Sequence, residues 1–199
     1  MDDIRSFDER AVRGSVALVE QLTPDDLGRP TPCGHWNLGE LLAHMAVQHD
    51  GFAAASTGAV TDLDVWEPRP LGDPAADYAA AADRVIAAFV DDDVLERRFT
   101  LPEISSEISF SGRTAISFHF VDYVVHAWDV AQSLGVPFAP DPDVLEAALL
   151  VAEAVPDGPS RREPGAAFAP GVAAPANAST LDRIVAMLGR DPAWAPPER

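Results

Sequence analysis

Apolar residues recur at helical spacing along the first part of the chain. Over residues 3–22 they fall three, four or seven positions apart, which is the pattern of one buried helix face. Residues 23–35 contain three prolines and two glycines and are predicted to form a loop. Asn37 then begins a second helix, with Glu40 as its capping-box partner, and this helix is expected to continue to Gly58.

Two further segments have the same periodicity. Asp73-Pro74 combines a capping residue with a proline at the first helical position, so a third helix is predicted from there to the acidic run 91–93. Residues 111–134 form the longest and most apolar segment, and Gly135 ends it as a C-terminal cap. Because its apolar residues lie on every side, this segment is predicted to be a helix buried on all faces.

Shorter elements complete the predicted fold. Residues 99–110 alternate weakly and are expected to form an extended connection or a small hairpin. Residues 143–155 are predicted to be helical, 156–175 to be a loop and 181–188 to be a last short helix. The prediction is therefore an all-α protein: a four-helix bundle with additional short C-terminal helices and a small hairpin before the long later helix. A length of 199 residues fits a single domain over 1–199, since one core suffices at this size.

Composition excludes several classes of partner. Lys plus Arg is 14 and Asp plus Glu is 32, so the net charge of -18 repels nucleic acid phosphates and anionic membrane surfaces. Although 47% of the residues are hydrophobic, the apolar runs are far shorter than the roughly 20 residues that span a bilayer. The acidic start lacks a secretory signal, and Cys33 has no second cysteine with which to pair. We therefore expect a cytoplasmic protein.

One histidine of the second predicted helix and two residues of the long one are candidate metal ligands. Asp122 and His126 are four positions apart, so both project from the same face of a helix. His44 can supply a third ligand from a neighbouring helix. Two imidazoles and a carboxylate suit zinc, nickel or ferrous iron, and three protein ligands leave one position open. An ion pair along the helix also explains the spacing. We favour a metal because an unpaired carboxylate is costly on a buried helix.

Four neighbouring residues have more than one interpretation. His119 is a possible fourth ligand, although a role in hydrogen-bonding a ligand or in core packing is favoured. Asp129 follows His126 by three positions and either accepts a hydrogen bond from its ring or is an exposed helix carboxylate. His49 points about 140° away from His44 on a helical wheel and is interpreted as a core or surface residue. For Cys33 we favour a structural role over that of a nucleophile.

Several of these residues belong to longer motifs that resemble a known family. The motifs are Thr31-Pro32-Cys33-x-x-Trp36, Leu41-Leu42-Ala43-His44-Met45, Asp122-x-x-x-His126-x-Trp128-Asp129 and Gly189-Arg190-Asp191-Pro192-x-Trp194. Together they resemble the actinobacterial DinB-like metal-binding proteins, relatives of the metal-binding domain of mycothiol-dependent maleylpyruvate isomerase, over nearly the whole chain. The resemblance implies a four-helix bundle that binds zinc or nickel through His44, Asp122 and His126.

The same resemblance limits what activity to expect. The isomerase looks to use glutamate where this chain has Asp122, and it has a separate C-terminal domain for which this chain has no room. Isomerisation of maleylpyruvate itself is therefore not expected. Instead we expect a metal-dependent transferase or isomerase that uses a small thiol, mycothiol by the resemblance, on a small electrophile, because a divalent cation stabilises the nucleophilic thiolate.

Other functions remain open on the sequence. The metal could be structural in a non-catalytic binding or interaction protein, or the same ligands could serve a ferrous oxygenase. Arg113 and Arg84 are candidates for binding an acidic ligand. A homodimer formed through bundle helices is a further option, although no residue pattern specifies one.

Overall fold

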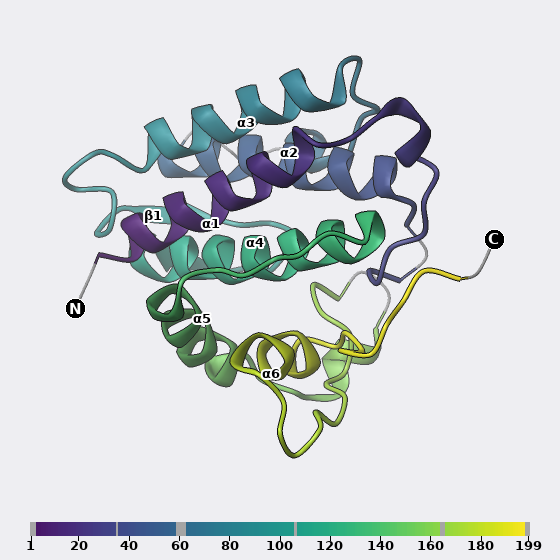
Figure 1. Cartoon of the computed structure of the whole chain (residues 1–199). Coiled ribbons are helices and arrows are strands. Elements are labelled where there is room, and N and C mark those ends of the chain that lie inside the picture. Colours follow the sequence, from purple (N-terminus) through teal and green to yellow (C-terminus); the bar gives the residue numbers. More distant parts are fainter. Residues whose placement is uncertain (1–2, 35, 59–62, 106, 164–165, 198–199) are drawn as a thin grey trace.

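Four long helices form a bundle in the computed structural model, which describes residues 3–34, 36–58, 63–105, 107–163 and 166–197 (Figure 1). The bundle helices are α1 (Ile4–Val19), α2 (Leu38–Ser56), α3 (Pro74–Ala88) and α4 (Gly112–Leu134). Helix α1 packs against α3 and α4, and α2 packs against the same two helices. Two shorter helices, α5 (Pro142–Ala154) and α6 (Thr180–Met187), pack together below the bundle in Figure 1, with α5 against α4. The predicted all-α bundle with short C-terminal helices is confirmed.

Local hydrogen bonds explain where these helices begin and end. Asn37 and Glu40 form a reciprocal capping box at the start of α2, each side chain accepting the other's backbone N–H at 2.9 Å. Asp73 caps α3 by accepting from the backbone N–H of Ala76. Gly135 ends α4 with φ 71°, a left-handed conformation that favours glycine. Helix α1 ends before the predicted Leu22 because the chain tightens into i→i+3 turns after Val19.

A two-stranded antiparallel hairpin precedes α4. Its strands are β1 (Arg98–Thr100) and β2 (Ser109–Ser111), with Phe99 opposite Phe110. The next residue, Gly112, leaves no room for a side chain, because a Cβ there would lie 1.8 Å from the carbonyl oxygen of Val94. Short 3-10 helices lie at Pro24–Asp26, Leu63–Trp66 and Pro159–Arg162.

Two clusters of buried apolar residues hold the helices together. The larger one joins the four bundle helices to α5 and α6, and the smaller one lies beneath the hairpin and includes Phe52, Trp66 and Phe99. Helix α4 contributes to both and has α5 against its outer side, so it is buried nearly all round, as its apolar composition predicts. No helix among the described residues is both long and apolar enough to cross a membrane.

Candidate metal centre

Three side chains from α2 and α4 converge at one place in the bundle. His44 comes from α2, Asp122 and His126 come from α4, and one potential ligand atom of each lies within 4.8 Å of the other two. Nε2 of His126 is 3.4 Å from Oδ1 of Asp122, and the His44 and His126 rings meet edge to face with centroids 5.5 Å apart. The structure therefore brings together the three residues that the sequence analysis selected.

His44 is held in the form that binds metal ions. Burial, with a smaller effect from the neighbouring His126, lowers the pKa of His44 to about 4. The ring is therefore neutral at physiological pH and keeps a lone pair. The indole of Trp36 packs on this ring, with centroids 4.5 Å apart. The Asp122 side chain keeps 23% of its surface exposed, so solvent reaches the cluster from that side.

Asp129 fixes the orientation of the His126 ring. Its Oδ2 accepts a hydrogen bond from Nδ1 of His126 at 3.0 Å, which leaves Nε2, the nitrogen nearer Asp122, with a free lone pair. This is the arrangement by which a carboxylate commonly orients a metal-binding histidine. Asp129 is fully buried, so the alternative of an exposed helix carboxylate does not hold.

Arg190 is a site residue to which the sequence analysis gave no role, although it lies in one of the quoted motifs. It follows α6 and points its Nη2 at Asp129 Oδ2 and at Cys33 Sγ, each 3.1 Å away. Burial by itself would lower the pKa of the Arg190 guanidinium, but the neighbouring Asp129 carboxylate opposes this effect and the pKa is raised. Arg190 therefore stays charged and balances the buried carboxylate.

The arginines suggested by the sequence lie elsewhere. Arg84 forms an ion pair with Asp50 on the surface, and Arg113 is exposed in the first turn of α4. Neither is part of the cluster around His126. The guanidinium found there is that of Arg190, which the packing of the C-terminal segment against α4 brings into place, and helical periodicity carries no signal for such a contact.

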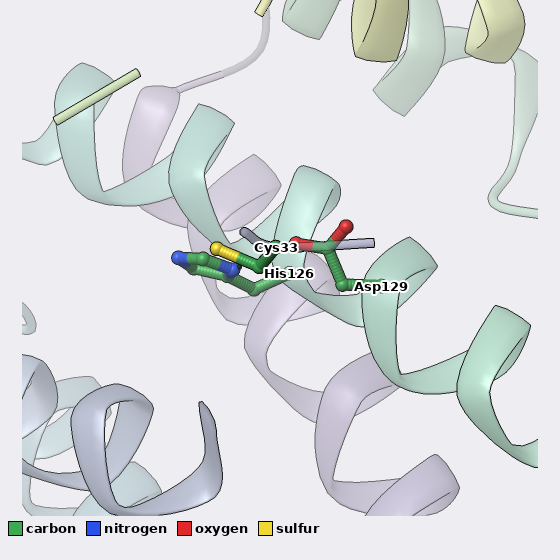
Figure 2. Close-up of side chains that lie close together, drawn as sticks. All are labelled: Cys33, His126 and Asp129. Atoms are coloured by element: carbon green, nitrogen blue, oxygen red, sulfur yellow. Dashed lines mark hydrogen bonds and ion pairs between the residues drawn. The ribbon is translucent and has the colours of Figure 1, made fainter. Parts of the chain in front are cut away.

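Cys33 lies next to this cluster, in the loop before α2 (Figure 2). Its sulfur, a ring nitrogen of His126 and a carboxylate oxygen of Asp129 all lie within 4.8 Å of one another. Burial raises the pKa of the Cys33 thiol to about 12, although the charge of Arg190 opposes that rise. The free protein therefore keeps Cys33 as a neutral thiol at physiological pH.

His119 and His49 form a separate pair deeper in the bundle. Nδ1 of His119 donates to Oδ1 of Asp8 at 2.6 Å, and its Nε2 lies 3.1 Å from Nδ1 of His49. All three side chains are buried. His119 precedes His126 by seven residues, about 10 Å along α4, and therefore contacts α1 and the middle of α2 rather than the candidate ligands. His49 is a core residue, which is one of the two interpretations that the sequence allowed.

Comparison with known proteins identifies the family to which this arrangement belongs. Residues 9–131 match the family model of the mycothiol maleylpyruvate isomerase N-terminal domain, and the chain belongs to this family. The uncharacterized proteins MT0763 and Rv0738, from two strains of Mycobacterium tuberculosis, are each 28% identical to it over 190 residues. These alignments cover 92% of this chain and 94% of each relative.

Solved structures share the fold at low sequence identity. A DinB-like protein from Bacillus subtilis gives a TM-score of 0.53 at 15% identity, over 69% of this chain and 96% of that one. The mycothiol-dependent maleylpyruvate isomerase gives 0.57 at 12% identity, and a mutant of it gives 0.59 at 13%. Each of these two alignments covers 77% of this chain and 71% of the isomerase chain. The expected DinB-like fold is thereby confirmed. Arg190 lies outside residues 9–131, which are the part of the chain that matches the family model.

Proposed function

We propose that this protein binds a divalent metal ion through His44, Asp122 and His126, and uses a small thiol in a transfer or isomerisation reaction on a small electrophile. The observation that carries the proposal is the convergence of these three donors within 4.8 Å. Membership of the mycothiol maleylpyruvate isomerase N-terminal family supports mycothiol as the thiol.

The residues present fit zinc or nickel. Two imidazoles and one carboxylate are ligands that both ions accept, and Asp129 presents Nε2 of His126 while His44 remains neutral. When bound, such an ion would lower the pKa of a thiol and stabilise the thiolate at neutral pH. The partly exposed Asp122 provides the side from which a small molecule can approach.

A cleft beside His44 could accept the second substrate. Its volume is about 410 Å³, within the usual range for small-molecule sites, and it shares Trp36 with the metal centre. Leu42, Pro70 and Leu71 form part of its apolar wall, and Arg69 and Glu40 add one charge of each sign. This lining suits a small electrophile that has an apolar body.

Metal analysis of the purified protein tests the first part of the proposal. The wild type should bind one equivalent of zinc or nickel, and His44→Ala and His126→Ala should each lose it. His49→Gln is the matched control, because it changes a buried histidine of the same helix pair outside the cluster. Full metal content in both alanine variants would contradict the proposed site.

A fluorogenic thiol-transfer reaction tests the second part. The metal-loaded protein is mixed with mycothiol and monochlorobimane, and the rate of adduct formation is compared with that after chelation. We expect turnover that depends on the metal and is abolished in His126→Ala. An ion that is retained without turnover across several electrophiles would favour a structural role, in which chelation only lowers the melting temperature.

A further inference from the structure

Cys33 has no role in the function proposed above, yet its position is fixed with respect to α4. The Thr31 hydroxyl accepts a hydrogen bond from the backbone N–H of Cys33 and donates one to the carbonyl of Trp36. Arg29, at the start of the same loop, donates to the carbonyls of Ser133 and Leu134 at the end of α4. The loop is thus attached at both ends, and the Cys33 sulfur faces the residues around His126 (Figure 2).

The polar groups beside Cys33 are incompletely satisfied. Oδ1 of Asp129 and Nε of Arg190 are buried and have no hydrogen-bond partner within the described part of the chain. Both residues are more than nine-tenths buried, and both lie against Cys33. Buried polar groups without partners are rare in folded proteins and commonly mark a place where a ligand or ion completes the structure.

Cys33, His126 and Asp129 are unsuited to form a second metal site by themselves. The Arg190 guanidinium lies 3.1 Å from both the sulfur and the carboxylate, so a cation among these atoms would face a positive charge at short range. His126 belongs to both groups of residues, and it is through His126 that the Cys33 sulfur approaches the metal centre already described. Among the described residues Cys33 forms no such group with His44 or Asp122, so its side chain has to turn toward them before the sulfur can bind the same ion.

We propose that Cys33 supplies a fourth ligand to the metal held by His44, Asp122 and His126, an inference that rests on the proposed function. In tetrahedral zinc sites a sulfur and a nitrogen ligand lie about 3.5 Å apart, as follows from bonds of about 2.3 and 2.0 Å. The Cys33 sulfur lies within 4.8 Å of one ring nitrogen of His126, so ligation needs a turn of the Cys33 side chain toward the Nε2 that faces Asp122. Ligation releases the thiol proton to solvent, and Arg190 stabilises the resulting negative charge. Cys33 then competes with an external thiol for the same position.

Cobalt substitution tests this proposal without an activity assay. Titration of the metal-free wild type with Co²⁺ should produce a thiolate-to-cobalt charge-transfer band, which Cys33→Ser lacks. Serine keeps an acceptor for Arg190, and its fold is checked by thermal melting. The variant should bind Co²⁺ about tenfold more weakly or worse, because even the loss of a group that orients a ligand costs 10–100-fold. It should also release one proton fewer per ion bound.

A second measurement uses the wild type alone and does not depend on the folding of a variant. Alkylation of Cys33, followed by mass spectrometry, should slow when Zn²⁺ is added and recover after chelation. Stoichiometric Co²⁺ binding without a charge-transfer band, or alkylation unaffected by Zn²⁺, would overturn the role of Cys33 and leave the proposed metal site standing. Failure of the wild type to bind Co²⁺ would overturn both.

Discussion

Single residues around His126 decide how well the site can hold an ion. Nδ1 of His126 donates a hydrogen bond to Asp129, and Nε2 of the same ring faces Asp122 in the cluster with His44. Arg190 in turn neutralises Asp129. The geometry of the candidate ligands therefore depends on two buried residues that need not contact the metal.

Replacing Asp129 tests this dependence. We expect Asp129→Asn to weaken metal binding by about 10–100-fold, because the amide holds the His126 ring less firmly and no longer favours Nδ1 protonation. Competition with a chelator measures the affinity, and Asp83→Asn, at an exposed aspartate of α3, is the control. Equal affinities in the two variants would show that Asp129 does not act through His126.

His49 makes stability depend on pH. Its pKa lies well below the ordinary value of 6.5 because of burial and the neighbouring His119. Below pH 6.5 the His49 ring therefore becomes protonated in the unfolded chain but stays neutral in the folded chain. The contribution of His49 to the free energy of unfolding is present above pH 6.5 and is lost as the pH falls below that value. Urea unfolding should show that the stability of the wild type relative to His49→Gln falls by up to about 1.4 kcal/mol per pH unit below 6.5. A difference that stays constant from pH 7.5 to 5 would contradict this account.

The sequence predicted the candidate ligands and offered Asp129 as a hydrogen-bond partner of His126, but it gave no role to Arg190. Asp122 and His126 lie one helical turn apart, so both face the same way once α4 is a helix. His44 joins them because α2 packs beside α4. Arg190 is 61 positions from Asp129, and its contact depends on the path of the C-terminal segment. His119 has the helical phase of a site residue, but its distance along the axis places it beside Asp8 instead.

At the scale of elements, the pairing of α2 with α4 arranges four histidines in two layers. His44 meets His126 and, further along α2, His49 meets His119, so the order along one helix is reversed along the other. The two helices therefore run antiparallel. The capping residues and apolar spacing predicted these helices well, whereas the hairpin was only an option, because its two strands are three residues each and alternate weakly.

Substitution by alanine should raise the free energy of unfolding at one helical glycine and lower it at another. A Cβ added to Gly14 in α1 would make an ordinary van der Waals contact at 3.9 Å, so Gly14→Ala should stabilise the protein by about 0.5–1 kcal/mol. Gly51 in α2 lies against the buried Trp66 ring, where a Cβ would come within 2.6 Å, so Gly51→Ala should destabilise by about 1–3 kcal/mol. Urea unfolding measures both, and stabilisation by Gly51→Ala would show that Trp66 does not pack there.

At the scale of the whole molecule, the segment after α6 connects the end of the chain to the centre of the bundle. In Figure 1 it rises beside the bundle to about the level of α4, and Arg190 within it reaches Asp129 of α4 and Cys33 before α2. The family match covers residues 9–131, so the candidate site combines residues from inside and outside the matched region.

Loss of the Arg190 charge should therefore destabilise the whole protein. Arg190→Gln leaves Asp129 buried without a charged partner, which typically costs about 3–5 kcal/mol. Chemical denaturation measures the loss, and Arg183→Gln, which removes a half-exposed arginine of α6, is expected to change stability by less than about 1 kcal/mol. Similar small effects in both variants would show that Asp129 is not charged in the folded protein.

The late position of Arg190 also affects how the protein is made. The ribosome releases α2 and α4 before position 190, so a nascent chain that has already paired these helices contains Asp129 without its cation. An ion bound at the proposed metal site during that interval would supply a counter-charge, and metal acquisition during translation would then assist the maturation of the bundle.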